Sequence, residues 1–340
     1  MYRVISNLLS IRKSKNLVCL SALAAGSFLL GHEGHPLSGN AVEGSGPRVI
    51  YLESQRSVSP AAELLSGAPT RGKNFAGGPD SEQSHTPTAG ELVVAVVANE
   101  LTDREKLQKW ICLIEKRAGK QTLTEAQVET REGPLYRLLA IDGVVLNPGQ
   151  RQEDDARIAR LMKDPKPLLK LKQSEDEDEL KLQKLMSLMP EAFVFDYDGT
   201  EDNLLRVKFR PNPGYLPPTY EARVIHSLAG NILIDSEHRR LAKVTGQLMT
   251  RVEFGYGLLG RVDSGTVEIA RVEVGPQQWK TVFINIHFSG RLAIFKTISK
   301  EQYERRSDFR TVSSDLSLAD AKSLLLSMVL PPAQNLRTSK

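Results

Sequence analysis

Two aspartates at the end of an apolar segment, Asp196 and Asp198, are the residues whose types and spacing most directly suggest chemistry. Residues 193–200 read FVFDYDGT, so the two carboxylates lie one residue apart where the apolar segment ends. A carboxylate can act as a nucleophile, and a second one nearby can act as a general acid or base. Whether this pair performs such chemistry depends on the elements that position it.

The stretch resembles the first motif of the haloacid-dehalogenase phosphatases, which reads D-x-D-G-T. The resemblance implies that Asp196 is the nucleophile toward phosphate and that Asp198 is the general acid or base. In that family the motif strand belongs to a parallel sheet and helical crossovers follow it, whereas here residues 204–210 form an alternating strand. No Gly-Asp-x-x-x-Asp-like pair follows in a suitable position to hold magnesium. The context favours a hairpin joined by D-G-T-E-D-N, and a phosphatase is the third function that we consider.

A second motif, Gly255-Tyr-Gly257-Leu-Leu-Gly260, spells G-x-G-x-x-G. Dinucleotide binding requires a helix that begins at this loop, because its first backbone amides hold the pyrophosphate. The residues that follow, RVDSGTVEIARVEV, have the alternation of a strand. We therefore expect a bulge or tight corner in a sheet.

Metal-binding and nucleophilic motifs are missing from the sequence beyond residue 89. The histidines there are His226, His238 and His287, without H-x-H or H-E-x-x-H spacing. There is also no Gly-x-Ser-x-Gly elbow for a serine nucleophile. These patterns predict no metal site, no cofactor and no enzymatic activity.

The N-terminus carries most of the net charge and has the layout of an export signal. Residues 1–41 hold four basic residues and one acidic residue, out of a net charge of +4 for 340 residues, so the charge is poor evidence for a nucleic-acid partner. A basic stretch precedes a 14-residue apolar run, Leu17–Leu30, and Gly39 and Ala41 suit a cleavage site. The run is shorter than the roughly 20 residues that span a bilayer. We predict a signal peptide at 1–41 and a periplasmic or secreted protein, or a membrane-tethered one if the signal stays uncleaved.

Residues 42–89 are rich in Gly, Ser, Pro and Ala, which predicts a flexible tether. The folded domain then occupies about 90–330. Cleavage of the signal removes Cys19 and leaves Cys112 alone, so no internal disulfide is expected, and Cys112 reads as a small buried apolar residue.

The first half of the domain is predicted to contain one helix, then three strands, then two helices. Thr88-x-x-Glu91 is a capping box before a helix, with a buried strand as the alternative for ELVVAVVANEL. A three-stranded meander follows at 109–117, 121–130 and 135–143. Two helices occupy about 150–189, separated at Pro165. We interpret the acidic run at 175–179 as the solvated side of the second helix, with a calcium site as the alternative.

The second half reads as strands and one last helix. Strands are predicted at 192–198, 204–210, 226–235, 240–249, 266–274, 279–288 and 291–299, and a more polar strand at 301–312 suits a sheet edge. A helix at about 317–330 begins with Ser317-x-x-Asp320. Because strands follow one another without alternating helices, the fold class is α+β with an antiparallel sheet.

This order of elements resembles the outer-membrane lipoprotein-sorting superfamily, the LolA/LolB/RseB-like half-barrels. Three stretches, RPNPGYLPP (210–218), AGNILIDSEHRRLAKVTGQL (229–248) and VEFGYGLLGRVDSG (252–265), also look like those of uncharacterised secreted bacterial proteins attached to it. The resemblance implies a strongly curved antiparallel sheet of about 10–11 strands whose concave face is covered by helices. It also implies that acyl chains bind in a cavity between the sheet and a helical lid.

Candidate lining residues share faces of their predicted strands at period two. They are Phe193, Phe195, Tyr197, Leu205, Val207, Phe209, Ile232, Ile234, Ile284, Ile286 and Phe288. The lid face consists of Leu182, Leu185, Met186 and Met189 at helical spacing. A close-packed core formed by the same side chains is the alternative to an open cavity.

We therefore expect a monomeric, non-enzymatic exported protein that binds lipid acyl chains or a lipoprotein. The second function that we consider is an interaction or sensing module on the same fold, which binds an envelope protein and carries no lipid. Neither function involves nucleic acid.

Overall fold

The computed structural model of the chain describes residues 86–103, 108–292, 296–328 and 330. The predicted signal peptide at 1–41 and nearly all of the predicted tether at 42–89 lie outside these residues. From Pro87 onward the described residues belong to one compact unit.

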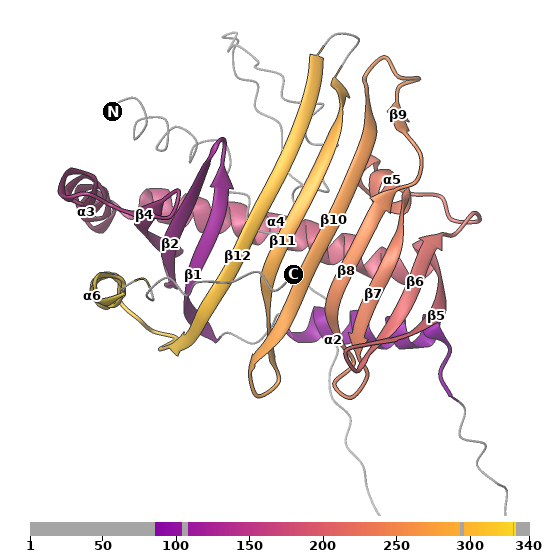
Figure 1. Cartoon of the computed structure of the whole chain (residues 1–340), viewed down its shortest axis with the longest axis horizontal. Helices are drawn as coiled ribbons and strands as arrows, with labels where there is room; N and C mark the ends of the chain where they lie inside the picture. Colours follow the sequence, from indigo (N-terminus) through magenta and orange to yellow (C-terminus); the bar gives the residue numbers. More distant parts are fainter. Residues whose placement is uncertain (1–85, 104–107, 293–295, 329, 331–340) are drawn as a thin grey trace, which may run out of the picture. The chain divides into compact units, whose positions relative to one another are not determined.

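The described residues contain five helices and twelve strands (Figure 1). The helices are α2 (Ala89–Asp103), α3 (Pro148–Lys163), α4 (Lys166–Ala192), α5 (Tyr220–His226) and α6 (Leu318–Ser327). The strands are β1 (Lys109–Ala118), β2 (Gln121–Glu129), β3 (Pro134–Ile141), β4 (Val144–Val145), β5 (Phe193–Glu201), β6 (Leu204–Pro211), β7 (Leu228–Asp235), β8 (Arg240–Leu248), β9 (Val252–Phe254), β10 (Gly260–Gly275), β11 (Gln278–Leu292) and β12 (Lys296–Val312).

All twelve strands form a single open sheet in which every pair of neighbours is antiparallel. The strand order is β4-β3-β2-β1-β12-β11-β10-β8-β7-β6-β5, and β9 pairs with β10 beside this path. The predicted class, α+β with a large antiparallel sheet, is confirmed. The N-terminal meander is also confirmed as β1 to β3.

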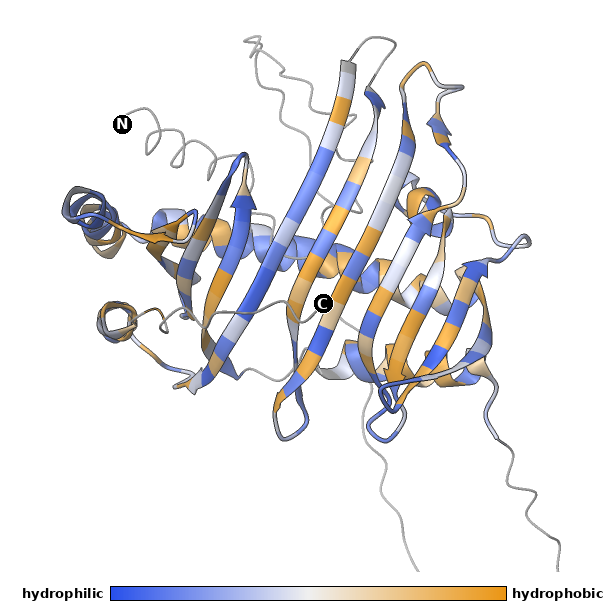
Figure 2. Ribbon diagram, viewed as in Figure 1, coloured by the Kyte–Doolittle hydropathy of each residue, from blue (hydrophilic) through white to orange (hydrophobic). Residues whose placement is uncertain are grey.

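The polar strand predicted at a sheet edge lies instead inside the sheet. β12 pairs with β11 on one side and with β1 on the other, and it appears as a mostly hydrophilic strand between them in Figure 2. The separate strands predicted at 291–299 and 301–312 are also wrong, because β12 runs without a break from Lys296 to Val312. Most of its described polar side chains are exposed or half-buried, and Glu304, which is buried, pairs with Arg306 on the same strand.

Side-chain hydrogen bonds cap the starts of the predicted helices α2 and α6. The backbone N–H of Glu91 donates to Thr88 Oγ1 (3.2 Å), and the N–H of Thr88 donates to the Glu91 carboxylate (2.7 Å), so the capping box of α2 is confirmed. Ser317 accepts a hydrogen bond from the N–H of Asp320 at the start of α6, which ends at Ser327 rather than near 330.

Three short elements escaped the sequence prediction: β4, α5 and β9. α5 has seven residues, capped by Thr219, and follows the Pro-rich stretch 211–218. β9 has three residues and β4 only two. Elements of this length show no full period of a hydrophobic pattern, so their positions depend on tertiary packing.

The hairpin predicted for the D-x-D-G-T stretch is confirmed, and its turn lies at the end of the predicted D-G-T-E-D-N connection. Asp202 and Asn203 both have positive φ, as in a two-residue hairpin turn between β5 and β6. Gly199, at φ 88°, lies in the β5 bulge between Tyr197 and Thr200. The G-x-G-x-x-G stretch likewise forms the turn between β9 and β10, with no helix after it.

The helix α4 crosses the strands of the sheet, as Figure 1 shows. It has 27 residues, which corresponds to about 40 Å of helix. Along the chain it connects the end of the sheet that holds β3 and β4 to β5 at the opposite end. Nine strand spacings of about 4.8 Å, or about 43 Å in all, separate β3 from β5, so the helix is nearly as long as this part of the sheet is wide.

The acidic run of α4 does not lie wholly on the solvated side, as the sequence had suggested. A stripe of residues spaced alternately three and four apart runs along α4: Leu168, Leu171, Glu175, Asp178, Leu182, Leu185, Met189 and Ala192. Asp178 is buried and Glu175 is half-buried, whereas Asp176 and Glu177 are exposed. Two acidic residues therefore occupy the middle of the inward stripe.

The helix α2 is held to the sheet by a buried carboxylate. Glu100 is 2% exposed, pairs with Arg271 of β10, and accepts a hydrogen bond from the backbone N–H of Leu241 (3.1 Å). Arg240 lies 3.9 Å from the same carboxylate. A buried ion pair of this kind is costly to break because the remaining charge stays out of water.

We predict that Glu100→Gln lowers the free energy of unfolding by about 3–5 kcal/mol, because Arg271 and Arg240 lose their buried counter-charge. Glu268→Gln is the matched control. It removes a 2.8 Å pair with Lys243 that is more than one-third exposed, so its effect should stay below about 1 kcal/mol. Urea denaturation measures both, and equal effects would contradict the anchoring role of Glu100.

Candidate functional site

Most of the candidate lining residues meet in one apolar core on the sheet. Phe195 and Leu205 pack against this core as half-buried side chains. Its buried members include Phe193, Val207, Phe209, Ile232, Ile234, Ile284, Ile286 and Phe288. The structure thus brings together residues that lie up to 95 positions apart in the sequence.

Tyr197 lies outside this core, although the sequence grouped it with Phe193 and Phe195. It is 44% exposed, and its hydroxyl donates to the backbone carbonyl of Pro87 (2.9 Å), just before α2. β5 is the last strand of the sheet, so no strand on its outer side places a side chain next to Tyr197.

Strand register explains why the core is continuous. Directly paired residues project to the same face of a sheet. Here the pairing forms one row across six strands, consisting of Val207, Ile232, Val244, Ile269, Ile284 and Glu304. The row is apolar from β6 to β11 and becomes acidic at β12, where Glu304 lies opposite Lys116 of β1 in the strand register.

Side chains of α2 and of the end of α4 pack against the apolar half of this face. Leu92, Val93, Val96 and Val97 of α2 belong to the core. The predicted lid residues Leu185 and Met189 pack against it, while Leu182 is buried nearer the middle of α4 and Met186 is half-buried. Three of the four lid residues therefore share the inward stripe, and Met186 lies beside it.

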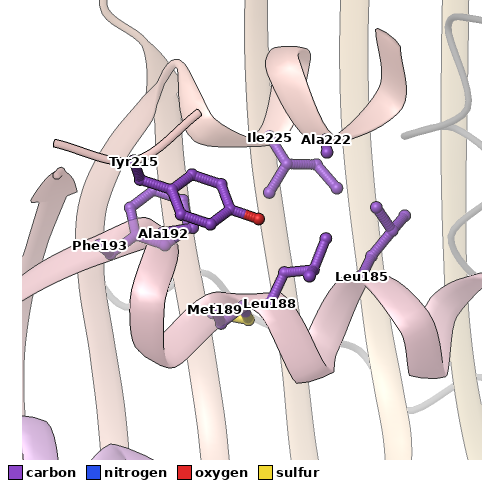
Figure 3. Close-up of a pocket in the computed structure, with 8 residues that line it drawn as sticks. All are labelled: Leu185, Leu188, Met189, Ala192, Phe193, Tyr215, Ala222 and Ile225. Carbon is purple, nitrogen blue, oxygen red and sulfur yellow. The ribbon is translucent and has the colours of Figure 1, made fainter. Parts of the chain in front are cut away.

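A small apolar cleft lies at the C-terminal end of α4 (Figure 3). In Figure 3, Tyr215 lies on one side of the cleft, Ala222 and Ile225 of α5 on another, and the α4 side chains Leu185 and Leu188 face them. Met189, Ala192 and Phe193 complete the lining. The cleft has a volume of about 10 Å³, which is room for about one water molecule.

Hydrogen bonds and ring contacts hold the outer wall of the cleft. A ring nitrogen of His226 lies 3.1 Å from the carbonyl oxygen of Asn212, and its ring packs 5.4 Å from that of Tyr215. Burial raises the pKa of Tyr215, and the Glu191 carboxylate adds to this effect. The sequence did not predict a lining role for Leu188, Tyr215, Ala222 or Ile225, although Tyr215 lies in RPNPGYLPP, one of the three stretches that carry the resemblance.

The other half of the same face holds charged side chains beside a smaller apolar cluster that contains Cys112, Ile114 and Tyr136. Together with Glu175 of α4 they form a set that we call the charge cluster: Lys116, Glu125, Glu129, Glu175, Lys280, Glu304 and Arg306. Glu125 and Glu304 are buried, and the others are half-buried. Lys116 Nζ lies 2.6 Å from Glu125, which is 2% exposed, and Arg306 pairs with Glu304 on the same strand. Glu129 accepts a hydrogen bond from the N–H of Trp110 (3.1 Å). Sequence reasoning missed the cluster because alternating charged residues on strands look like a solvated face.

Buried aromatic and thiol groups surround the charges. Lys116 lies 5.1 Å from the centre of the Tyr136 ring, and Lys280 lies 5.3 Å from the Trp110 ring. Burial raises the pKa of Tyr136 well above its ordinary value, with a further contribution from the Glu175 charge. Burial also raises the pKa of Cys112 to about 12, so its thiol stays protonated at neutral pH and is a poor nucleophile.

The two aspartates of the D-x-D-G-T stretch make surface ion pairs with β6. Asp198 lies 2.7 Å from Lys208 and 3.2 Å from Arg206, and the hydrogen bond from Lys208 lowers its pKa. Asp196 lies 3.6 Å from Arg210. Each carboxylate is engaged by a basic side chain of an antiparallel neighbour, which differs from the parallel-sheet setting of the phosphatase motif.

Among the residues that the structure describes, no group of three or more His, Cys, Asp and Glu side chains is arranged to hold a metal ion. None of the helices in this part of the chain is both long and apolar enough to cross a bilayer. Comparisons with protein-family models, with curated proteins and with solved structures each found no match.

We predict that Phe193→Ala lowers the free energy of unfolding by about 3–5 kcal/mol, because it removes a buried ring that packs 5.1 Å from that of Phe209. Tyr197→Ala on the same strand should cost much less, since that side chain is largely exposed. Chemical denaturation of the two variants measures the difference. Similar losses would show that Tyr197 belongs to the core after all.

Proposed function

We propose that this protein binds an acyl chain, carried by a lipid or a lipoprotein, between the apolar half of its sheet and the end of α4. The observation that carries the proposal is the cleft in Figure 3, in which every lining side chain is aliphatic, aromatic or a thioether. In this proposal the sheet is a curved half-barrel, and α2 and α4 cover its concave face. Binding would require no catalytic residue, cofactor or metal.

Acyl-chain binding requires the cleft to open. Ligand pockets usually measure about 300–1,000 Å³, whereas this cleft holds about 10 Å³. The walls best suited to move are the seven-residue α5 and the α4 side chains Leu188 and Met189, which line the cleft without being fully buried. Met189 suits this role because its unbranched side chain repacks readily around apolar guests.

Burial of methylenes supplies the driving force. Each buried methylene contributes roughly 0.8 kcal/mol, so eight of them contribute about 6 kcal/mol. Part of this energy is spent on separating α5 from α4. The basic and apolar N-terminus supports export, which would place the domain where it could meet envelope lipids.

Leu188→Gln should weaken binding of a fluorescent fatty acid by about 10-fold to 100-fold, because it places an amide in the cleft in place of a side chain worth about 1.5–3 kcal/mol of apolar contact. Leu180→Gln makes the same change on the same helix at a position that is 56% exposed, and should bind like the wild type. Fluorescence titration measures both. If the two variants bind alike, the cleft is not the binding site.

A second candidate function is an interaction module that binds an envelope protein. Exposed apolar side chains near α5 and the β9–β10 turn favour it: Leu216, Tyr220, Met249, Tyr256, Leu258 and Leu259. Contacts connect these segments, because Tyr220 packs 5.0 Å from Phe254 of β9 and the N–H of Met249 donates to Ser227 at the end of α5. Apolar side chains grouped in this way are typical of interaction sites.

If the chain is such a module, a photo-crosslinking residue at Leu258 should capture one defined envelope protein. The same residue at Val144, which is 71% exposed on β4, should not. The interaction module further predicts that the wild type takes up no fluorescent fatty acid. Equal capture from both positions, or none, would contradict it.

A further inference from the structure

The middle of α4 contacts the sheet through charged groups, unlike its two ends. Leu168 and Leu171 pack against apolar clusters near β1 to β3, and Leu185 and Met189 pack against the apolar core. Between them the inward stripe carries Glu175 and Asp178. Asp178 has a partner on its own helix, Lys181, at 3.2 Å.

Glu175 faces a cluster whose positive charges already have partners. Lys116 pairs with Glu125, Arg306 pairs with Glu304, and Lys280 lies close enough to Glu129 to act on its charge. The cluster therefore contains four carboxylates and three cations. Oε1 of Glu175 is buried without a hydrogen-bond partner among the described residues.

We propose that a proton on Glu175 holds the middle of α4 against the sheet, and that loss of this proton releases it. A neutral Glu175 leaves three carboxylates facing three cations, so no net charge remains buried. An ionised Glu175 adds an unmatched charge out of water, which is costly. Undocking α4 returns that carboxylate to solvent.

The surroundings of Glu175 favour its protonated form. The pKa of Glu175 is raised to about 7, chiefly by burial; the Glu129 and Asp176 charges act in the same direction, while Arg306 and Lys172 act against it. The titratable and charged groups around it are Lys116 and Cys112 on β1, Glu125 and Glu129 on β2, Tyr136 on β3, Lys280 on β11, Glu304 and Arg306 on β12, and Lys172, Asp176 and Asp178 on α4.

The sign of the pH effect follows from linkage. The docked state binds a proton more tightly than the undocked state, whose carboxyl has its ordinary pKa of about 4.5. Docking is therefore most favourable below about pH 4.5, weakens as pH rises, and reaches a plateau above about 7. Between pH 5.5 and 8.0 the opening equilibrium of α4 should increase about 30-fold.

Hydrogen exchange of the full chain tests the proposal. Amides of residues 172–182, normalised for intrinsic exchange rates, should lose protection by about 30-fold from pH 5.5 to 8.0 in the wild type. Glu175→Gln, which mimics the protonated side chain, should stay protected at both values. Glu177→Gln removes an exposed carboxylate from the same acidic run and should keep the wild-type pH dependence.

The wild-type profile needs no variant, so the test survives even if Glu175→Gln does not fold. Wild-type protection that does not change with pH would overturn the proposal, as would a Glu175→Gln protein that keeps the wild-type midpoint. Loss of the pH dependence in Glu177→Gln would also overturn it. The proposal holds or fails whether or not the cleft binds lipid.

Discussion

The structure depends on the match between one helix and one face of a sheet. α4 runs from the β3–β4 end of the sheet to β5, and its inward stripe changes from apolar to acidic and back to apolar. The sheet face changes in step, with charges on β12, β1 and β2 and an apolar core from β5 to β11. Because a helix with this spacing presents one stripe, sliding α4 by one turn would place Glu175 or Asp178 against apolar side chains. The polar residues thus favour one position of α4 along the sheet, while packing of the apolar residues contributes most of the free energy that holds the helix there.

The position of β12 makes this match possible. The last strand of the sequence pairs with the first, so the N-terminal meander and the seven later strands β5 to β11 form one surface. In the ladder between β1 and β12, Lys116 lies opposite Glu304, which is 188 positions away in the sequence. Such long-range contacts form only after a large loss of chain entropy. The same strand supplies Glu304 and Arg306 to the charge cluster that Glu175 of α4 joins. The polar residues Glu304 and Arg306 of β12 therefore correspond to the acidic residues in the middle of α4.

Local patterns predicted local structure well. The capping residues Thr88 and Ser317 and the period-two strands 109–117 and 204–210 were recognisable because each signal lies within a few residues. The hairpin after Asp198 was predicted for the same reason, and its turn falls at Asp202 and Asn203. What the sequence could not provide was pairing between distant segments. Glu304, expected on an edge strand, is buried because β12 lies between β11 and β1, and Asp178, expected on a solvated helix face, is buried on the inward stripe of α4.

The candidate site was predictable only in part. The apolar faces of the strands could be grouped by alternation, and all but Tyr197 do meet. The outer wall of the cleft, formed by Tyr215 and α5, depends on packing that no periodicity shows.

The proposed function requires the apolar face beneath α4 to accommodate an acyl chain. Native mass spectrometry of the protein after export to a periplasm tests this most directly. We expect a one-to-one adduct with the mass of a lipid, which a fluorescent fatty acid displaces. A ligand-free protein that also fails to take up the fluorescent fatty acid would contradict the proposed function.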